Sequence, residues 1–468
     1  MTAEALTGQA TGWTVREDVR EAALRPMARA GWRFWALVAT LTALTLPGLG
    51  AYVYQLRRGL GVTGLDDQVF WGVYTANLIA FIGISYGGAV VSAILRLTGA
   101  EWRAPITRLA EAMAVVSLGI GAMFAVIHVG HPERLWRLAF SPNASSPLVW
   151  DAVAIGTYFV ATIVLLYLPL IPDFAVVRDR AGGGVGSLRR RLYGLLSLGW
   201  RNEPHQRRRL GRGMTQIAVL IIPLAITVHS VLAWAFGLTS RAGWHSTAFG
   251  PYFVVGALLS GIAAVILVVA GFRRAYHLEA HITVEHFRRL ATVMLVLGLL
   301  YLYLTVAEFL TEGYLSDERN APMLESLLLK DFAPLFWVFV VLGGAVPTLL
   351  VSIPRTRTIN GIVVAATLAV AGLWLKRLLI IVPPLAQGAD GGGLHYQGSL
   401  VEGSITLSAV AAIPLLMMLL FRFIPVISIF EVEEIVNQET ATARDVGVVS
   451  VPAARTVPVP GLAADRGS

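Results

Sequence analysis

Long apolar runs alternate with short polar segments along the chain. Each run has about twenty residues or more, the length that an α-helix needs to cross a hydrocarbon core of roughly 30 Å. The pattern predicts an all-α, polytopic membrane protein with about ten transmembrane helices. We place these helices near residues 31–54, 71–97, 108–129, 149–171, 214–236, 250–272, 288–311, 332–351, 360–382 and 404–428. Residues 1–30 and 429–468 lie outside them.

The composition agrees with this interpretation. Mean hydropathy is +0.68, with 56% hydrophobic and 14% charged residues. A polar, arginine-bearing stretch precedes the first run, so we expect no cleavable signal peptide. Residues 1–30 are predicted to form a cytoplasmic N-terminal segment and residues 429–468 a cytoplasmic, disordered tail, which from about Glu439 is rich in Ala, Val, Pro and Arg. No large water-soluble domain is expected.

The distribution of charge orients the chain in the membrane. With a cytoplasmic N-terminus, most of the 37 Lys and Arg fall in inner segments, as the positive-inside rule requires. Both termini are then cytoplasmic. The segment between the fourth and fifth helices contributes most, and we interpret it as a topology signal that also touches anionic lipid. Nucleic-acid binding is not expected. Binding of a partner protein at the inner leaflet is an open alternative.

The chain has no cysteine. It therefore has no disulfide and no Cys-ligated iron–sulfur cluster, so a redox centre would be quinone-like, His-ligated or held by a partner. His277, His281 and His286 share one polar segment among charged neighbours. We expect no metal site there or elsewhere.

A weak internal repeat links two groups of helices. GAVVSAI from Gly88 recurs as GALLSGI from Gly256, and RLAEAM from Arg108 recurs as RLATVM from Arg289. Shared apolar composition is the alternative explanation. A true repeat would give two four-helix bundles, formed by helices two to five and six to nine, plus one flanking helix at each end of the chain. Small residues that suit close helix contact occur at Gly87, Gly88, Ala89, Ser92, Gly256, Ala257, Ser260 and Gly261.

Polar side chains at membrane depth gather toward the outer face in this orientation. His128 ends the third helix and Asp151 begins the fourth, and a short outer loop joins them. A histidine and a carboxylate near one ligand can bind both oxygens of a quinol and accept its protons. Such groups inside a membrane usually indicate function. Further candidates in the outer half are His229, Glu308, Lys376 and Arg377, with Tyr158 on the same helical face as Asp151.

Each of these residues also has a structural interpretation. His128 could be satisfied by a backbone carbonyl, and Asp151 could cap its helix. Tyr158 could serve only packing, and His229 could be a satisfied core histidine. Glu308 could be solvated at the interface. For Lys376 and Arg377 we favour side chains that extend outward along the helix to the interface.

Several motifs resemble one known family. HVGHPERLW at His128 resembles the signature of NrfD/PsrC-family membrane subunits. The longer resemblance, over about residues 70–310, is to the ten-helix NrfD-like subunit of alternative complex III. It is carried by SPLVWDAVAIGTYF at Ser146, LIPDFAVVRDRA at Leu170, YGLLSLGW at Tyr193, PLAITVHSV at Pro223 and GWHSTAFGPYFVVGALLSG at Gly243.

The resemblance implies a quinol-binding subunit of a respiratory oxidoreductase rather than a stand-alone enzyme. It places the chain in the bacterial cytoplasmic membrane with two four-helix bundles and a menaquinone or ubiquinone site near the outer face. Electrons would pass to a periplasmic iron–sulfur or molybdopterin-like subunit and then to c-type cytochromes, beside other small membrane subunits. The chain itself would hold no haem or iron–sulfur cluster.

The same resemblance assigns roles to residues. His128 and Asp151 match the motif residues of the quinol site, and His131, Arg134 and Trp150 lie in the same two motifs. Tyr158, His229, Glu308, Lys376 and Arg377 are the candidates for a linked proton path.

Besides a loop from His128 to Asp151 that is shorter than usual, the chain departs from the family pattern at three residues. His131 replaces an arginine, Ala235 stands where an acidic residue is expected, and Lys376 replaces an acidic neighbour of Arg377. Each change removes or inverts a protonatable group. Quinone binding is therefore the stronger expectation and a transmembrane proton channel the weaker one.

Other functions remain open at the level of sequence. The chain could anchor another molybdopterin or iron–sulfur oxidoreductase, such as a polysulfide reductase-like enzyme. A proton-coupled secondary transporter would also have about ten helices and a repeat, but its site would lie near the midplane. A haem b subunit would need facing histidines, for which only His128 and His229 are suitable.

Overall fold

The computed structural model describes residues 17–28, 30–180, 187–239, 241–315, 320–386 and 396–435. All regular secondary structure within these ranges is helical. The predicted tail beyond Glu439 lies outside them.

Ten helical segments in the described ranges are long and apolar enough to cross a membrane. Each overlaps one predicted run, so the all-α, ten-helix prediction is confirmed. The segments are α2 (Trp32–Arg58), α3 (Val73–Leu97), α4 (Ala104–His128), α6 (Pro147–Tyr167), α9 (Pro204–Gly237), α10 (Phe249–Ala275), α11 (Val284–Leu315), α13 (Ala333–Val338) continued by the π-helical η6 (Phe339–Ala345) and α14 (Val346–Ser352), α15 (Ile359–Ala386) and α16 (Leu400–Leu420).

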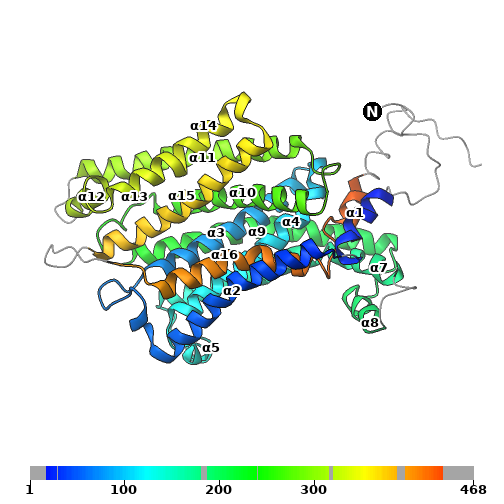
Figure 1. Ribbon diagram of the computed structural model, residues 1–468, viewed down its shortest axis with the longest axis horizontal. Coiled ribbons are helices and arrows are strands. Elements are labelled where there is room, and N and C mark those ends of the chain that lie inside the picture. Colours follow the sequence, from blue (N-terminus) through cyan, green and yellow to red (C-terminus); the bar gives the residue numbers. More distant parts are fainter. Residues whose placement is uncertain are drawn as a thin grey trace, which may run out of the picture.

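Short helices lie at the two ends of this array of long helices (Figure 1). The loops after α2 and α4 contain η2 (Leu60–Val62), η4 (Pro132–Arg134) and α5 (Trp136–Phe140), and α12 (Ala321–Leu328) lies at the same end. We call this the His128 end. The opposite end, called the Asp173 end, contains α1 (Glu17–Ala28), η3 (Glu101–Arg103), α7 (Leu170–Arg180), α8 (Ser187–Leu196) and η7 (Pro354–Thr356).

The long helices form two packed bundles. Helices α3, α4, α6 and α9 pack together as the first, and α10, α11, the α13–α14 segment and α15 as the second. The bundles meet mainly along α3 and α10. The first and last spans, α2 and α16, pack against each other as one helix pair (Figure 1).

Small residues allow the close approach of α3 and α10. A Cβ atom on Gly87 would collide with the backbone of Gly261, and one on Gly261 would collide with Gly87. Gly88 lies equally close to the Ala110 carbonyl of α4. The sequence prediction that these glycines serve helix contact is confirmed, and they occur in the corresponding helices of the two bundles.

A network of buried ion pairs closes the Asp173 end. Arg108 donates to Asp173 at 2.9 Å with both side chains almost fully buried, and Asp173 Oδ1 accepts from the Phe430 backbone N–H at 3.1 Å. Burial raises the pKa of the Asp173 carboxyl to about 6, while the Arg108 guanidinium acts in the opposite direction. Glu431 accepts from Thr107 at 2.6 Å and pairs with Arg96 at 3.1 Å.

These contacts correct the predicted start of the C-terminal tail. Residues 429–435 are helical, and Ile429, Phe430 and Glu431 are buried. Glu433 also pairs with Arg20 of α1 at 2.8 Å. The apolar residues here are too few for a membrane span, and the segment is ordered by its ion pairs and by the packing of Ile429 and Phe430 into the core.

Candidate functional site

His128 is the last residue of α4, at a sharp turn of the backbone. Gly130 follows with φ of +72°, a conformation that suits glycine and ends the helix. Gln55 of α2 donates to the Ile127 carbonyl at 3.0 Å and accepts from the Tyr74 hydroxyl at 2.6 Å. Side chains from α2 and α3 therefore fix the end of α4.

Asp151 lies in the second turn of α6, after the helix begins at Pro147. Its Oδ1 is buried and has no hydrogen-bond partner within the described ranges. Asp151 Oδ1 therefore does not cap the helix, and the capping interpretation is wrong for this oxygen. Helix α6 packs against α4, which brings the two candidate residues to one pair of helices at one end of the protein.

His128 shares this feature, since its Nδ1 is also buried without a partner in the part of the chain that the structure describes. The interpretation that a carbonyl satisfies this nitrogen finds no support. Buried polar atoms in folded proteins almost always have a partner, and leaving one unpaired costs about 1–3 kcal/mol. Two such atoms on packed helices indicate a place for a polar ligand.

The other predicted quinone-site residues lie in the open. His131 Nδ1 and Glu133 Oε1 are 2.8 Å apart, and both side chains are 64% exposed. Arg134 is similarly exposed beside Glu133. The Trp150 indole donates to the Ala144 carbonyl at 2.6 Å. His131 and Arg134 thus lie in the accessible loop between α4 and α6, and Trp150 lies exposed in the first turn of α6.

A buried polar cluster fills the first bundle deeper inside. The Tyr158 hydroxyl lies 3.3 Å from Ser85 Oγ, and the rings of Tyr86 and Tyr158 are 5.3 Å apart. The His229 ring lies 4.3 Å from that of Tyr86, edge to face. Both ring nitrogens of His229 are buried without a hydrogen bond to a described residue, so the satisfied-core interpretation is wrong.

The predicted outward extension of Lys376 and Arg377 is also wrong. Both side chains are buried, with Lys376 Nζ over the rings of Phe309, Tyr252 and Phe339 at 4.6, 5.4 and 5.5 Å. Arg377 donates to Ser260 Oγ at 3.0 Å. Both residues face the interior of the protein, on the side of α15 that packs against α3, α10 and η6.

Glu308 is buried rather than solvated. It accepts a 2.5 Å hydrogen bond from Ser246, and helix α11 continues for two further turns beyond it. Glu308 and Lys376 line one small cavity in the second bundle. The second bundle thus holds its own buried charges, separate from His128 and Asp151.

The comparisons with known proteins decide the family. The family model described as polysulphide reductase, NrfD, matches residues 61–387. The chain belongs to the NrfD family. The match begins just after α2 and ends with α15, so it contains both four-helix bundles.

Three curated NrfD-type relatives cover most of the chain. A candidate membrane subunit of dimethyl sulfoxide reductase from Halobacterium salinarum is 26% identical, over 84% of this chain and 91% of its own. A subunit of selenate reductase from Mesobacillus selenatarsenatis is 25% identical, over 82% and 93%. The Hdr-like menaquinol oxidoreductase integral membrane subunit of Archaeoglobus fulgidus is 24% identical, over 75% and 79%.

Sequence reasoning overlooked one acidic residue within the predicted spans of this NrfD-family chain. Glu111 lies inside a predicted span, is buried in α4, and accepts a 2.6 Å hydrogen bond from Ser92. Its Oε2 has no partner among the described residues. Glu111 lies in the half of α4 toward the Asp173 end, so polar groups are not confined to the outer half as predicted. A scan of each predicted span for acidic residues would have found it.

Proposed function

We propose that this NrfD-family chain is the quinol-binding membrane subunit of a respiratory redox complex, with the quinol between His128 and Asp151. The observation that carries this proposal is the pair of orphaned polar atoms on the packed helices α4 and α6. The name of the Archaeoglobus relative, Hdr-like menaquinol oxidoreductase integral membrane subunit, supports a quinol as the ligand.

The two residues supply what quinol oxidation needs. Loss of two electrons from a quinol releases two protons, and a carboxylate and a neutral imidazole can each accept one. Because the sequence has no cysteine, the electrons would pass to a partner's iron–sulfur centre. The exposed loop with His131 and Arg134, together with Trp150 at the start of α6, offers this partner a surface beside the site.

The finer assignment is to a complex like alternative complex III. In that case the partner is a periplasmic iron–sulfur or molybdopterin-like subunit, and c-type cytochromes accept the electrons next. The relatives from dimethyl sulfoxide and selenate reductases are equally similar in sequence, and in such complexes the same site would serve a molybdopterin partner.

Proton movement linked to this reaction has candidate groups in the first bundle. Tyr158, Tyr86 and His229 form a buried polar cluster with Ser85. Glu111 lies farther along α4, toward the opposite end of the bundle. In the second bundle, the candidate groups for proton movement are Glu308, Lys376 and Arg377.

The test is quinol-dependent reduction of the partner's redox centres by the intact complex. We expect His128→Ala and Asp151→Asn each to lower the rate by about 100-fold or more, as removal of an acid–base group does. Asp67→Asn and His245→Ala are matched controls, because both residues are exposed at the His128 end and neither belongs to the candidate quinol site. Unchanged rates in both site variants, with the complex assembled, would refute the assignment.

A further inference from the structure

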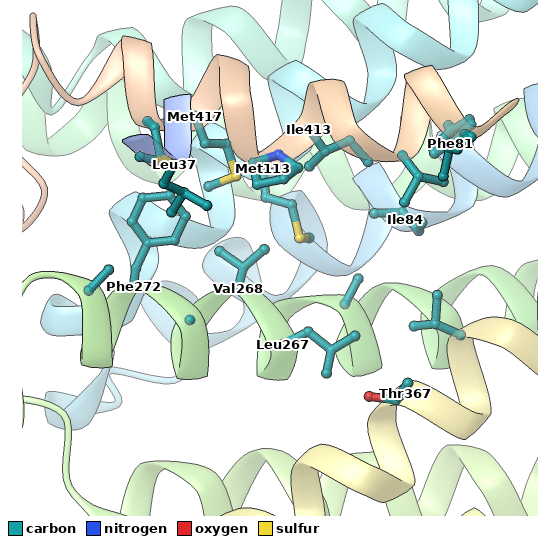
Figure 2. Close-up of a pocket in the computed structure, with 18 of the residues that line it drawn as sticks. Leu37, Phe81, Ile84, Met113, Leu267, Val268, Phe272, Thr367, Ile413 and Met417 are labelled. Carbon is teal, nitrogen blue, oxygen red and sulfur yellow. The ribbon is translucent and has the colours of Figure 1, made fainter. Parts of the chain in front are cut away.

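A long groove runs between the α2–α16 pair and the second bundle. It has a volume of about 1520 Å³ and is lined by residues of α2, α3, α4, α10, α15 and α16. Figure 2 shows its apolar middle, where Leu37, Met113, Val268, Phe272 and Met417 face one another. Neither His128 nor Asp151 lines it.

The size and lining of the groove indicate a long, apolar occupant. The volume exceeds the roughly 300–1,000 Å³ typical of small-molecule pockets. The lining extends from Arg33 and Arg274 at the Asp173 end to Ser399 and Glu402 at the His128 end. An acyl chain fits such a groove better than a compact polar ligand does.

Polar groups toward the His128 end are already engaged with one another. Glu402 accepts from the backbone N–H groups of Gly64 and Ser399 and from the Tyr396 hydroxyl, at 2.8, 2.9 and 2.6 Å. The Trp374 indole donates to Asn77 at 2.7 Å. This end therefore offers few free polar groups to a ligand head.

The Asp173 end differs in its charge. Arg33 and Arg274 are exposed at the groove and form no ion pair with a described carboxylate, and Arg25 reaches only an exposed Glu21 at 3.8 Å. The Tyr276 hydroxyl is buried there without a partner in the described chain. Glu279 is the carboxylate among the described lining residues at this end.

We propose that the groove holds an anionic diacyl phospholipid, with its phosphate against Arg33, Arg274 and Tyr276 and its acyl chains along the apolar middle. Two unpaired guanidinium groups and one orphaned hydroxyl complement a phosphate. Burial raises the pKa of Tyr276 to about 12, so its hydroxyl stays a donor at neutral pH. In the expected orientation this end faces the cytoplasmic leaflet, where anionic lipids concentrate.

The test is mass spectrometry of lipid retained by the complex after purification in mild detergent, with phosphatidylglycerol and phosphatidylcholine as added probes. We expect wild type to retain phosphatidylglycerol in preference to phosphatidylcholine. The double variant Arg33→Gln/Arg274→Gln should bind phosphatidylglycerol roughly fivefold more weakly for each arginine removed. Arg355→Gln, an exposed arginine at the same end but outside the groove, should have no effect.

A second variant blocks the groove itself. An added Cβ on Gly271 meets no atom within 4 Å, so Gly271→Trp can fill the groove without disturbing the helix. Gly156→Trp is its control, since Gly156 is equally open but lies on α6 away from the groove. Phospholipid should be lost only from Gly271→Trp. Two results would overturn the proposal. One is undiminished retention of phospholipid in Arg33→Gln/Arg274→Gln or in Gly271→Trp. The other is loss of co-purified quinone or of a partner subunit, in place of phospholipid, from these variants.

Discussion

At the scale of single residues, unsatisfied polar atoms say more about this protein than residue type does. His128, Asp151, His229 and Glu111 each present a buried atom without a hydrogen bond to a described residue. A side chain kept only for packing gains nothing from such an atom, because desolvation without a partner is unfavourable. These four residues are therefore the ones to mutate first.

Lys376 allows the effects of charge and of volume to be separated. We expect Lys376→Met to lower the melting temperature less than Lys376→Ala does, because methionine fills similar space among the three rings. Lys376→Ala should lower stability by about 2–4 kcal/mol through the cavity it leaves. Thermal unfolding of the purified complex in detergent measures both. Equal losses in the two variants would show that the ammonium group itself stabilises the bundle.

The candidate site was only partly predictable at this scale. His128 and Asp151 follow from their place at the ends of adjoining apolar runs, which needs only the sequence. The environment of Lys376 depends on Phe309 and Phe339, which come from two other helices. Periodicity within one helix cannot specify such neighbours, so the outward orientation predicted for Lys376 was wrong.

At the scale of elements, the crossing of α3 and α10 is the contact least able to accept a side chain. We expect Gly87→Leu to abolish assembly or to lower stability by several kcal/mol, because its Cβ would meet the backbone of Gly261. Gly156→Leu is the control, with open space around its Cβ. Both changes improve helix propensity by about 1 kcal/mol. Expression and thermal unfolding measure the difference, and similar behaviour of the two variants would contradict the close contact.

The Arg108–Asp173 pair at the end of α4 predicts a dependence on pH. Arg108→Met leaves the Asp173 carboxylate buried without its countercharge and should lower stability by about 3–5 kcal/mol at about pH 8. The pKa of Asp173 is already raised to about 6, and loss of Arg108 raises it further. Since the folded state then binds a proton more tightly than the unfolded chain, the deficit should shrink as pH falls toward about 5.

The control for this prediction removes both charges. Arg108→Met/Asp173→Asn cannot titrate at this position, so its stability relative to wild type should vary less between the two pH values. A deficit in Arg108→Met that is the same at about pH 5 and about pH 8 would contradict the pH argument. Thermal unfolding at each pH is the measurement.

The elements themselves were largely predictable. Span length and hydropathy located all ten helices, because a membrane span must satisfy its backbone internally over a fixed thickness. The helix at 429–435 was missed, since its order comes from Arg96, Thr107 and Arg20, which lie far away in sequence. The pairing of α2 with α16 has the same explanation, because neither apolar run specifies its partner.

At the scale of the whole molecule, the candidate quinol site and the lipid groove lie apart. The first is formed at the His128 end of α4 and α6, and the second is lined by the α2–α16 pair, by α3 and α4 of the first bundle and by α10 and α15 of the second, but by neither His128 nor Asp151. Substitutions in the groove should therefore change lipid retention without acting directly on His128 or Asp151. Ion pairs and hydrogen bonds at the Asp173 end join α1, α4, α7 and the segment 429–435.

The central claim is that this NrfD-family chain works as the quinol-binding subunit of a larger redox complex. The most direct measurement is purification of the tagged chain in mild detergent, with mass spectrometry of its partners and a spectrum before and after quinol addition. We predict a co-purified iron–sulfur subunit and quinol-dependent reduction of the bound redox centres. A stable, folded chain without any redox partner would contradict the claim and would favour a proton-coupled transporter.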